Sequence, residues 1–301
     1  TILNARIRKA YLQNKTKIIS LNDVGDLTYP YESLDGDIEN IKKITEDNHE
    51  VSSLIKEAKK PLIIFGQSSL KTKSAKYIFE SVKSFLKKNN KMSDEWNSLN
   101  TISENASTVG SFDLGLYKTV DGSNEVLKDL ENHMFEIVYL LGVDNLKFEK
   151  KNEFVIYQGS HGDKGAEIAD IILPGAAYTE QNGYFTNLEG KIQKAYKASF
   201  PPEEAKEDWL IINELAEAMN HRKLFNDKDE LDSSLLNQIN LFIEKDKSIK
   251  SSTVENIEFK QEILKVENED YYYSNAIARA SKTMLECKTA KVNLKLTGTE
   301  G

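Results

Sequence analysis

Short, largely apolar runs alternate with longer helical segments through residues 1–175 of this chain. Apolar runs without regular polar alternation are typical of strands whose sheet is covered on both faces. Strands separated by helical segments predict a mostly parallel, Rossmann-like sheet with helices on both faces, so the expected fold class is α/β. The expected strands are residues 17–21 (KIISL), 62–65 (LIIF), 137–141 (IVYLL), 154–157 (FVIY) and 171–173.

The segments between these runs show helical signals. Residues 4–13 are expected to form the first helix, and a second helix is expected to end before Pro61, which cannot continue it. Residues 74–88 are expected to form a third helix with one apolar face. That face consists of Tyr77, Ile78, Val82, Phe85 and Leu86.

Several of the expected strands end in a glycine, at Gly66, Gly142, Gly159 and Gly175. A glycine at this point lets the chain turn sharply and brings backbone amides to the carboxyl edge of the sheet. Ligands of open α/β folds usually bind at that edge. The candidate ligand site is therefore expected there.

The later part of the chain changes character. Residues 182–196 contain an Asn-Gly turn signal between two short strand patterns, which predicts a small β-hairpin or flap. Residues 201–219 predict a helix with Pro202 in its first turn and a buried stripe. The stripe is Trp209, Ile212, Leu215, Ala216 and Met219.

From residue 221 onward the sequence is mainly polar, and a final helix is expected over residues 274–291. We therefore predict two parts: an α/β domain over residues 1–220, and a polar linker with a helical C-terminal extension over residues 221–301. The role of residues 221–270 does not follow from their sequence.

Charge and cysteine content exclude several classes of protein. The chain has 40 basic and 48 acidic residues, a net charge of −8, which argues against a nucleic-acid partner. The single cysteine, Cys287, excludes an iron–sulfur cluster ligated by cysteines of this chain alone. His49, His133, His161 and His221 lack ligand spacing, and no run reaches the roughly 18–20 apolar residues of a membrane span.

Gly159, Gly162 and Gly165 are spaced three residues apart after an expected strand. Such a turn can present backbone amides to a phosphate, but a plain strand–turn–helix corner explains it as well and is favoured. His161 and Asp163 in this turn suggest an acid–base pair. The simpler interpretation is that Asp163 caps the following helix.

Other chemical groups are weaker candidates. Glu180 and Glu189 flank the expected hairpin, where solvated loop carboxylates are the better interpretation. Residues 271–273 (YYY) are either an aromatic docking patch or a buried cluster. Cys287 is expected to be a small residue on the apolar face of the last helix. No residue is assigned as catalytic, cofactor-binding or metal-binding.

One long motif resembles a known family. Residues 155–193, VIYQGSHGDKGAEIADIILPGAAYTEQNGYFTNLEGKIQ, resemble the C-terminal, molybdopterin-oxidoreductase-like part of the 75 kDa iron–sulfur subunits of mitochondrial complex I (NADH:ubiquinone oxidoreductase). The segments NARIRKAYL, DLTYPY, EAKKPLIIFG, LLGVD and NAIARASKTMLEC support the resemblance in the same order. It spans nearly the whole chain, but it is weak over residues 67–108 and 221–270.

The resemblance implies a domain that keeps a cofactor-binding fold without a molybdenum cofactor. It implies a non-catalytic structural and assembly role in the matrix arm of complex I, at the mitochondrial inner membrane. It also implies complex I subunits as partners, membrane association only through the complex, and iron–sulfur clusters in a missing N-terminal part or a partner chain. The chain is expected to be either a C-terminal portion or a separately encoded half of such a subunit.

Two alternatives to this role remain open. The chain can be a live oxidoreductase domain that binds a molybdopterin or nucleotide, or a nucleotide-binding regulatory domain.

Overall fold

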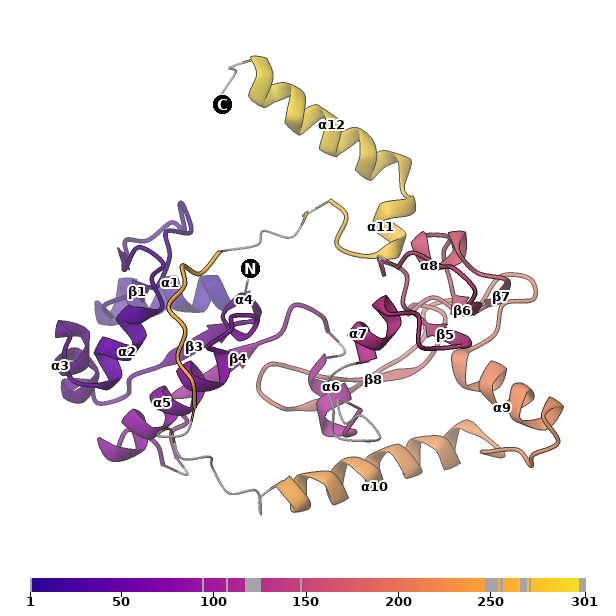
Figure 1. Ribbon diagram of the computed structural model, residues 1–301, viewed down its shortest axis with the longest axis horizontal. Helices are drawn as coiled ribbons and strands as arrows, with labels where there is room; N and C mark the ends of the chain where they lie inside the picture. The colour runs from indigo at the N-terminus through magenta and orange to yellow at the C-terminus, as the bar shows by residue number, and fades with distance from the viewer. Residues whose placement is uncertain are drawn as a thin grey trace. The chain divides into compact units, whose positions relative to one another are not determined.

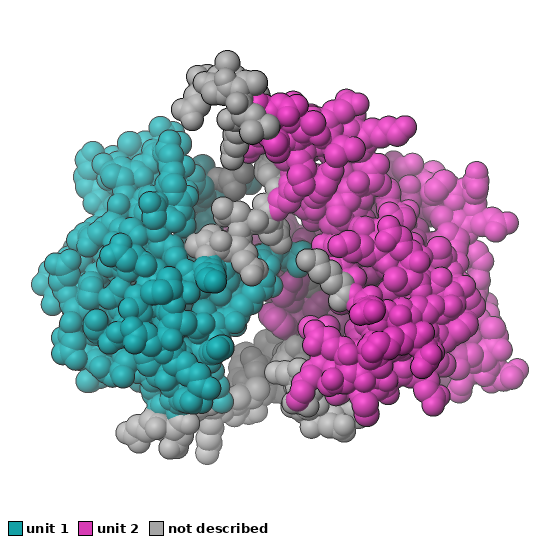
Figure 2. Space-filling view, turned by 45° about the horizontal axis from the view of Figure 1, so that its top comes forward, with its two compact units in different colours: residues 1–105, 249–268 teal, residues 106–248, 269–301 magenta. Residues whose placement is uncertain are grey.

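The computed structural model describes residues 2–93, 95–106, 108–116, 126–146, 148–246, 254, 257–265, 270 and 272–297. The chain forms two compact units, residues 1–105 with 249–268, and residues 106–248 with 269–301 (Figure 2). We call them unit 1 and unit 2. The predicted domains, residues 1–220 and 221–301, stay a prediction, but both units draw on residues beyond 220.

Unit 1 combines helices with two small parallel sheets (Figure 1). Its elements are α1 (Ile2–Asn14), β1 (Ile19–Ser20), β2 (Glu32–Ser33), α2 (Glu39–Thr45), α3 (Glu50–Glu57), β3 (Ile63–Gly66), α4 (Gln67–Leu70), α5 (Ala75–Lys88) and β4 (Leu99–Ile102).

Unit 2 contains a parallel sheet in the order β5-β6-β7 and the antiparallel hairpin β8-β9 (Figure 1). Its elements are α6 (Thr108–Asp113), α7 (Val126–Glu131), β5 (Ile137–Leu141), β6 (Phe154–Gly159), α8 (Lys164–Glu167), β7 (Ile171–Pro174), β8 (Gly183–Thr186), β9 (Ile192–Ala195), α9 (Asp208–Ala218), α10 (Lys228–Asp246), α11 (Ala276–Ala280) and α12 (Lys282–Thr297).

The α/β class, the mainly parallel pairing, the hairpin and the C-terminal helix are confirmed. In the described residues the parallel strands form separate small sheets, because β3 and β4 belong to unit 1 and β5, β6 and β7 to unit 2. The sequence prediction missed β2 and β4. Both are short and carry polar residues, so they lack the apolar run that identified the other strands.

Helix α5 follows its sequence pattern. Ile78, Val82, Phe85 and Leu86 are buried at helical spacing, and Tyr77 is half-buried beside them. Ile78, Val82 and Leu86 join Ile38, Phe65 and Leu99 in the core of unit 1.

The sheet of unit 2 buries one face. Val138 and Leu140 of β5 lie beside Val155 and Tyr157 of β6, and with Leu130 of α7 they form the core. The opposite face exposes Ile137, Leu141, Phe154 and Ile171, and Ile137 is 64% exposed. This face is covered at its carboxyl end, where Gln158 is 0% exposed and its Nε2 donates to Asp208 of α9 at 2.8 Å. Apolar runs indicate that a face is suited to burial, without showing what covers it.

The predicted start of the helix at residues 201–219 is wrong, and the predicted buried stripe holds only in part, since Trp209, Ile212 and Ala216 are half-buried. Pro202 lies in a turn closed by the amide of Ala205, which donates to the Pro202 carbonyl at 2.9 Å, and α9 begins only at Asp208. Of the residues of α9, Ile211 and Asn213 are buried. Leu215 and Met219, which were expected to be buried, are exposed.

A buried carboxylate joins α7 to the start of β6. Glu153 accepts a hydrogen bond from the Lys151 amide at 2.7 Å, and its other oxygen lies 2.7 Å from Nδ1 of His133. The Lys151 N–H is the main cause that lowers the pKa of Glu153 from 4.5 to about 2. Burial opposes this shift, while the Glu153 amide and His133 reinforce it.

We predict that Glu153 contributes to acid resistance. Its folded-state pKa is depressed, so its contribution is complete above pH 4.5 and is lost as the pH falls toward about 2. Glu153→Gln should make the free energy of unfolding less dependent on pH in this window, measured by urea unfolding at several pH values. Glu149→Gln, which removes an exposed carboxylate nearby, should behave like the unmodified chain. Equal pH dependence in the Glu153→Gln and unmodified chains would contradict this assignment.

Candidate functional site

The carboxyl edge of the β5-β6-β7 sheet carries a candidate site in unit 2. Gly159 ends β6, and Gly142 and Gly175 directly follow β5 and β7, as the sequence predicts. A pocket of about 670 Å³ opens beside Gly159 and Gly175. Its lining residues are Gly159, Ser160, His161, Pro174, Gly175, Ala177, Glu180, Pro202, Glu203, Glu204 and Ala205.

Tyr157 explains two of the three glycines in the turn after β6, Gly159 and Gly165. A Cβ on Gly159 would collide with the Tyr157 hydroxyl, and one on Gly165 would lie 2.8 Å from the Tyr157 ring and 2.6 Å from the Val143 carbonyl. Tyr157 is only 2% exposed, and its hydroxyl donates to the His161 carbonyl at 2.9 Å. The turn therefore wraps around a buried side chain, which supports a strand–turn–helix corner over a phosphate loop.

Asp163 caps α8, as the simpler interpretation expected. Its Oδ1 accepts from the Lys164 amide at 2.8 Å, and its Oδ2 accepts from Nε of Arg279 at 2.5 Å. Burial favours a higher pKa, but the bond to Arg279 and the Lys164 amide outweigh it and lower the pKa of Asp163. His161 has a different neighbour, since its Nδ1 lies 2.9 Å from the Ser160 hydroxyl. The acid–base pairing of His161 with Asp163, which was the less favoured alternative, is not found.

Arg279 is a structural residue beside this turn that the sequence prediction missed. Besides Asp163, its guanidinium contacts Oδ1 of Asp144 at 2.9 Å and donates to the Tyr273 carbonyl at 3.1 Å. It therefore holds the segment around α11 against the turn that follows β6. A weak signal existed, because the chain has only four arginines, Arg6, Arg8, Arg222 and Arg279.

A second network fills the edge between β6 and α9. Gln158 is 0% exposed, its Oε1 accepts from the Tyr139 hydroxyl at 2.5 Å, and its Nε2 donates to Oδ1 of Asp208 at 2.8 Å. Oδ2 of Asp208 accepts from Nε2 of Gln181 at 3.0 Å. A Cβ on Gly175 would lie 2.7 Å from Oδ1 of Asp208. These side chains satisfy one another and leave little room for a ligand beneath Gly175.

The remaining pocket is acidic. Glu180, Glu203 and Glu204 line it, and neither Lys nor Arg is among its described lining residues. Glu180 also accepts a hydrogen bond from the Ala177 amide at 2.9 Å. Three carboxylates without a counter-cation disfavour phosphate groups. The lining residues therefore do not fit a cofactor that carries phosphates.

The predicted flap is tied to two helices. Asp232 of α10 accepts from Nζ of Lys194 at 2.7 Å and from the Tyr184 hydroxyl at 3.3 Å. Thr186 of β8 donates to Asp113 of α6 at 3.0 Å. These bonds give the hairpin a packing role between α6 and α10.

The other candidates from the sequence lie apart. Glu180 lies in the pocket, whereas Glu189 lies in the turn between β8 and β9, where its amide donates to Oδ1 of Asn187 at 2.9 Å. His49 caps α3, and Cys287 is exposed, so its predicted place on an apolar face is wrong. No group of three or more described His, Cys, Asp or Glu side chains is arranged to hold a metal ion.

Two of the three tyrosines at 271–273, Tyr272 and Tyr273, support the last helix. Tyr271 lies outside the described residues. Nζ of Lys288 lies 4.2 Å from the ring centre of Tyr273, and Nζ of Lys291 lies 5.6 Å from that of Tyr272. Cation–π contacts of this kind join the segment before α11 to α12.

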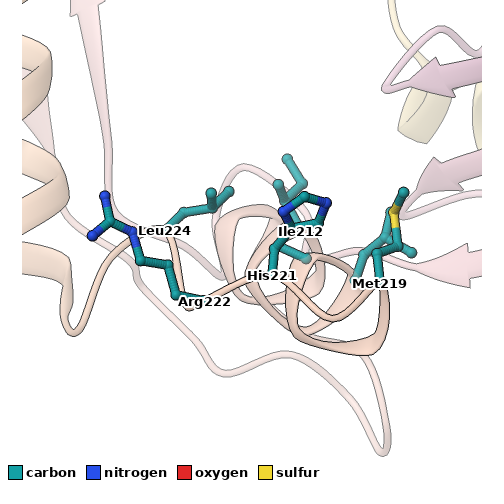
Figure 3. Close-up of a pocket in the computed structure, with 7 residues that line it drawn as sticks. Ile212, Met219, His221, Arg222 and Leu224 are labelled. Atoms are coloured by element: carbon teal, nitrogen blue, oxygen red, sulfur yellow. The ribbon is translucent and has the colours of Figure 1, made fainter.

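The exposed stripe of α9 lines a second, mainly apolar groove of about 380 Å³ (Figure 3). Met219 is 62% exposed, and Leu224 is also exposed. The close-up shows Met219 and Arg222 at opposite ends of the labelled group. The lining residues are Ile212, Leu215, Ala216, Met219, His221, Arg222 and Leu224.

Comparison with protein families gives two matches along the chain. The model of the molybdopterin oxidoreductase family matches residues 1–218. The model of the C-terminal region of the G subunit of NADH-ubiquinone oxidoreductase matches residues 240–287. Together they cover most of both units.

Individual relatives agree with these matches. The NADH-ubiquinone oxidoreductase 75 kDa subunit of Reclinomonas americana is 35% identical over 96% of this chain and 42% of its own length. The G subunit of the NADH-quinone oxidoreductase of Rickettsia bellii is 35% identical over 99% and 43%. The mitochondrial NADH-ubiquinone oxidoreductase 78 kDa subunit of Candida albicans is 33% identical over 95% and 40%.

The chain thus spans about two fifths of the length of these relatives. The match over residues 1–218, the C-terminal match and the relatives all support the resemblance seen in the sequence. This chain belongs to the molybdopterin oxidoreductase family, and its relatives are 75 kDa, 78 kDa and G subunits of NADH-ubiquinone and NADH-quinone oxidoreductases.

Proposed function

We propose that the chain is a non-catalytic structural and assembly part of the matrix arm of respiratory complex I, at the mitochondrial inner membrane. The names of its relatives support a place in NADH-ubiquinone oxidoreductase. The Candida relative is named as mitochondrial, whereas the Rickettsia relatives are bacterial, so the compartment is part of the proposal. In this proposal iron–sulfur clusters lie in a partner chain or in the part of the relatives that this chain does not span.

The hydrogen-bond network around Asp208 is the main observation that supports a non-catalytic role. At the sheet edge where α/β folds bind ligands, Gln158, Gln181 and Asp208 bond to one another. The glycine turn beside them packs on Tyr157. The pocket that remains carries carboxylates at positions where a phosphate-bearing cofactor needs cations or free amides.

Exposed apolar surfaces support partner binding by this chain. The groove on α9 and the open sheet face around Ile137 and Phe154 expose side chains that a stable subunit interface would bury. Arg222 adds a cation beside the groove, which favours a partner with a carboxylate near its apolar side chains. None of the described helices is both long and apolar enough to span a bilayer. We propose that another complex I subunit covers the groove.

A live molybdopterin- or nucleotide-binding domain is the second candidate, because the pocket of about 670 Å³ opens beside Gly159 and Gly175. Metal analysis of the purified chain and mass spectrometry after denaturation distinguish the two candidates. We expect no stoichiometric molybdenum and no released nucleotide. Detection of either at one equivalent per chain would favour the second candidate.

We predict that Gly175→Val damages folding and assembly without affecting the chemistry. The new side chain would collide with Asp208, whose carboxylate is held by Gln158 and Gln181. We expect the free energy of unfolding to fall by about 1–3 kcal/mol, as in other overpacked sites, measured by urea unfolding. Complex I containing this variant should be less abundant, with unchanged NADH:ubiquinone turnover per assembled complex.

The matched control is Gly162→Val, because a Cβ at Gly162 meets no atom within 4 Å. This control should fold and assemble like the unmodified chain. A Gly175→Val chain that assembled normally but lost turnover would show that this edge takes part in the chemistry.

We also predict that Met219→Ser with Leu224→Ser weakens assembly and leaves the isolated chain intact. Both side chains are exposed, so the free energy of unfolding should change by no more than about 0.5 kcal/mol. If these side chains contribute about 1.4 kcal/mol to the free energy of partner binding, their loss reduces the affinity for the partner about tenfold. The measurement is the amount of chain that comigrates with other complex I subunits on native gels.

Leu188→Ser is the control for this pair, since Leu188 is a similarly exposed leucine in the turn of the β8-β9 hairpin. It should comigrate normally. Normal comigration of the Met219→Ser/Leu224→Ser chain would exclude the groove on α9 as an interface.

A further inference from the structure

Residues 257–265 (IEFKQEILK) lie along unit 1, although unit 2 residues 106–248 precede them in the chain. We call these nine residues the strap. Figure 1 shows this segment passing α2 and α5. The Leu264 amide donates to the Gly36 carbonyl at 2.8 Å, and the Ile38 amide donates to the Glu262 carbonyl at 3.2 Å. These two bonds form an antiparallel bridge between Asp37 and Ile263.

One buried hydroxyl holds the centre of the strap. The Ser74 hydroxyl donates to the Lys260 carbonyl at 2.9 Å and accepts from the Lys260 amide at 2.7 Å. Ser74 is only 1% exposed, so loss of the strap would leave its hydroxyl without these partners. Oε1 of Glu262 accepts from the Lys73 amide at 2.7 Å, which extends the same contact.

The far end of the strap is fixed by Asn22. Its Nδ2 donates to the Leu264 carbonyl at 2.7 Å. A Cβ on Gly36 would lie 2.7 Å from this nitrogen, and Gly36 has a φ of +78°. Glycine is therefore required at residue 36 both for the turn and for close approach of the strap.

Two apolar side chains anchor the strap in the core of unit 1. Phe259 and Leu264 pack against the cluster that contains Ile38 and Ile78. The Phe259 ring centre lies 5.1 Å from that of Tyr77, whose half-buried position on α5 is explained by this contact. Ile263, between the bonded residues, is exposed and contributes little to the anchoring.

We propose that unit 1 contains a peptide-binding groove whose ligand is the chain's own strap. The ligand class is an extended peptide with an aromatic residue and, five positions later, a leucine, paired by backbone hydrogen bonds. The groove is formed by Asn22, Gly36–Ile38, Ser74 and Tyr77. Because unit 2 separates the strap from the rest of unit 1, unit 1 is completed only when the C-terminal part of the chain docks. This site is independent of the proposed role in complex I.

The test uses hydrogen exchange with mass spectrometry on the full chain. Phe259→Ala with Leu264→Ala should speed exchange at the amides of Ile38 and Lys260 about tenfold and leave β6 amides unchanged, since only unit 1 loses contacts. Ile263→Ala, the matched control, should leave both regions unchanged. Unchanged exchange in unit 1 of the double variant would overturn the proposal.

A synthetic peptide of residues 257–265 then tests recognition directly. Added to the double variant, it should slow exchange at Ile38 saturably, whereas the same peptide with alanine at positions 259 and 264 should not. Equal protection by both peptides would refute specific recognition. If the double variant loses protection from exchange in β6 as well, the same measurement is made on Ser74→Ala in the full chain. Loss of protection in unit 1 alone supports the peptide-binding groove. Loss of protection in both units refutes it.

Discussion

The buried amide of Gln158 is the group on which the arrangement of the candidate site depends. It lies at the end of β6 without solvent contact, so its hydrogen-bonding capacity must be met by protein groups. Tyr139 of β5 and Asp208 of α9 provide these partners, and Asp208 is bound in turn by Gln181. The network connects two strands, the start of α9 and the segment after β7. It also occupies the sheet edge, which is the usual ligand site of an α/β fold.

The C-terminal part of the chain stabilises both units through polar contacts with residues far away in the sequence. In unit 1, the strap satisfies Ser74 and the backbone around Gly36. In unit 2, Arg279 binds Asp144 and Asp163 beside the turn that follows β6. The C-terminal family match covers residues 240–287, which include both the strap and Arg279. These contacts give a structural role to a region for which the sequence predicted a polar linker and a helical C-terminal extension.

Local sequence signals predicted local structure well. The apolar spacing of α5, the strand-end glycines, the β8-β9 hairpin and the cap at Asp163 all follow from residues close together in the chain. The stripe on α9 shows the limit of such signals. Periodicity identified an apolar face, but burial depends on what packs against that face, and in the described residues Met219 is exposed.

Contacts between distant residues left no comparable signal. Arg279 and Asp163 are 116 positions apart, and Ser74 and Lys260 are 186 apart. Their side chains are polar and have no periodicity, so the sequence marks neither partner. The family resemblance rested mainly on one long motif, yet it did not reveal that Gly159 and Gly165 within that motif pack against Tyr157.

The central claim is that the pocket beside Gly159 and Gly175 has no part in electron transfer. The most direct measurement replaces His161 by Ala and both Glu203 and Glu204 by Gln, and leaves the networks around Gln158 and Arg279 in place. NADH:ubiquinone turnover is then measured per assembled complex. The account predicts turnover equal to that of the complex with the unmodified chain. A marked loss of turnover in fully assembled complex would contradict it.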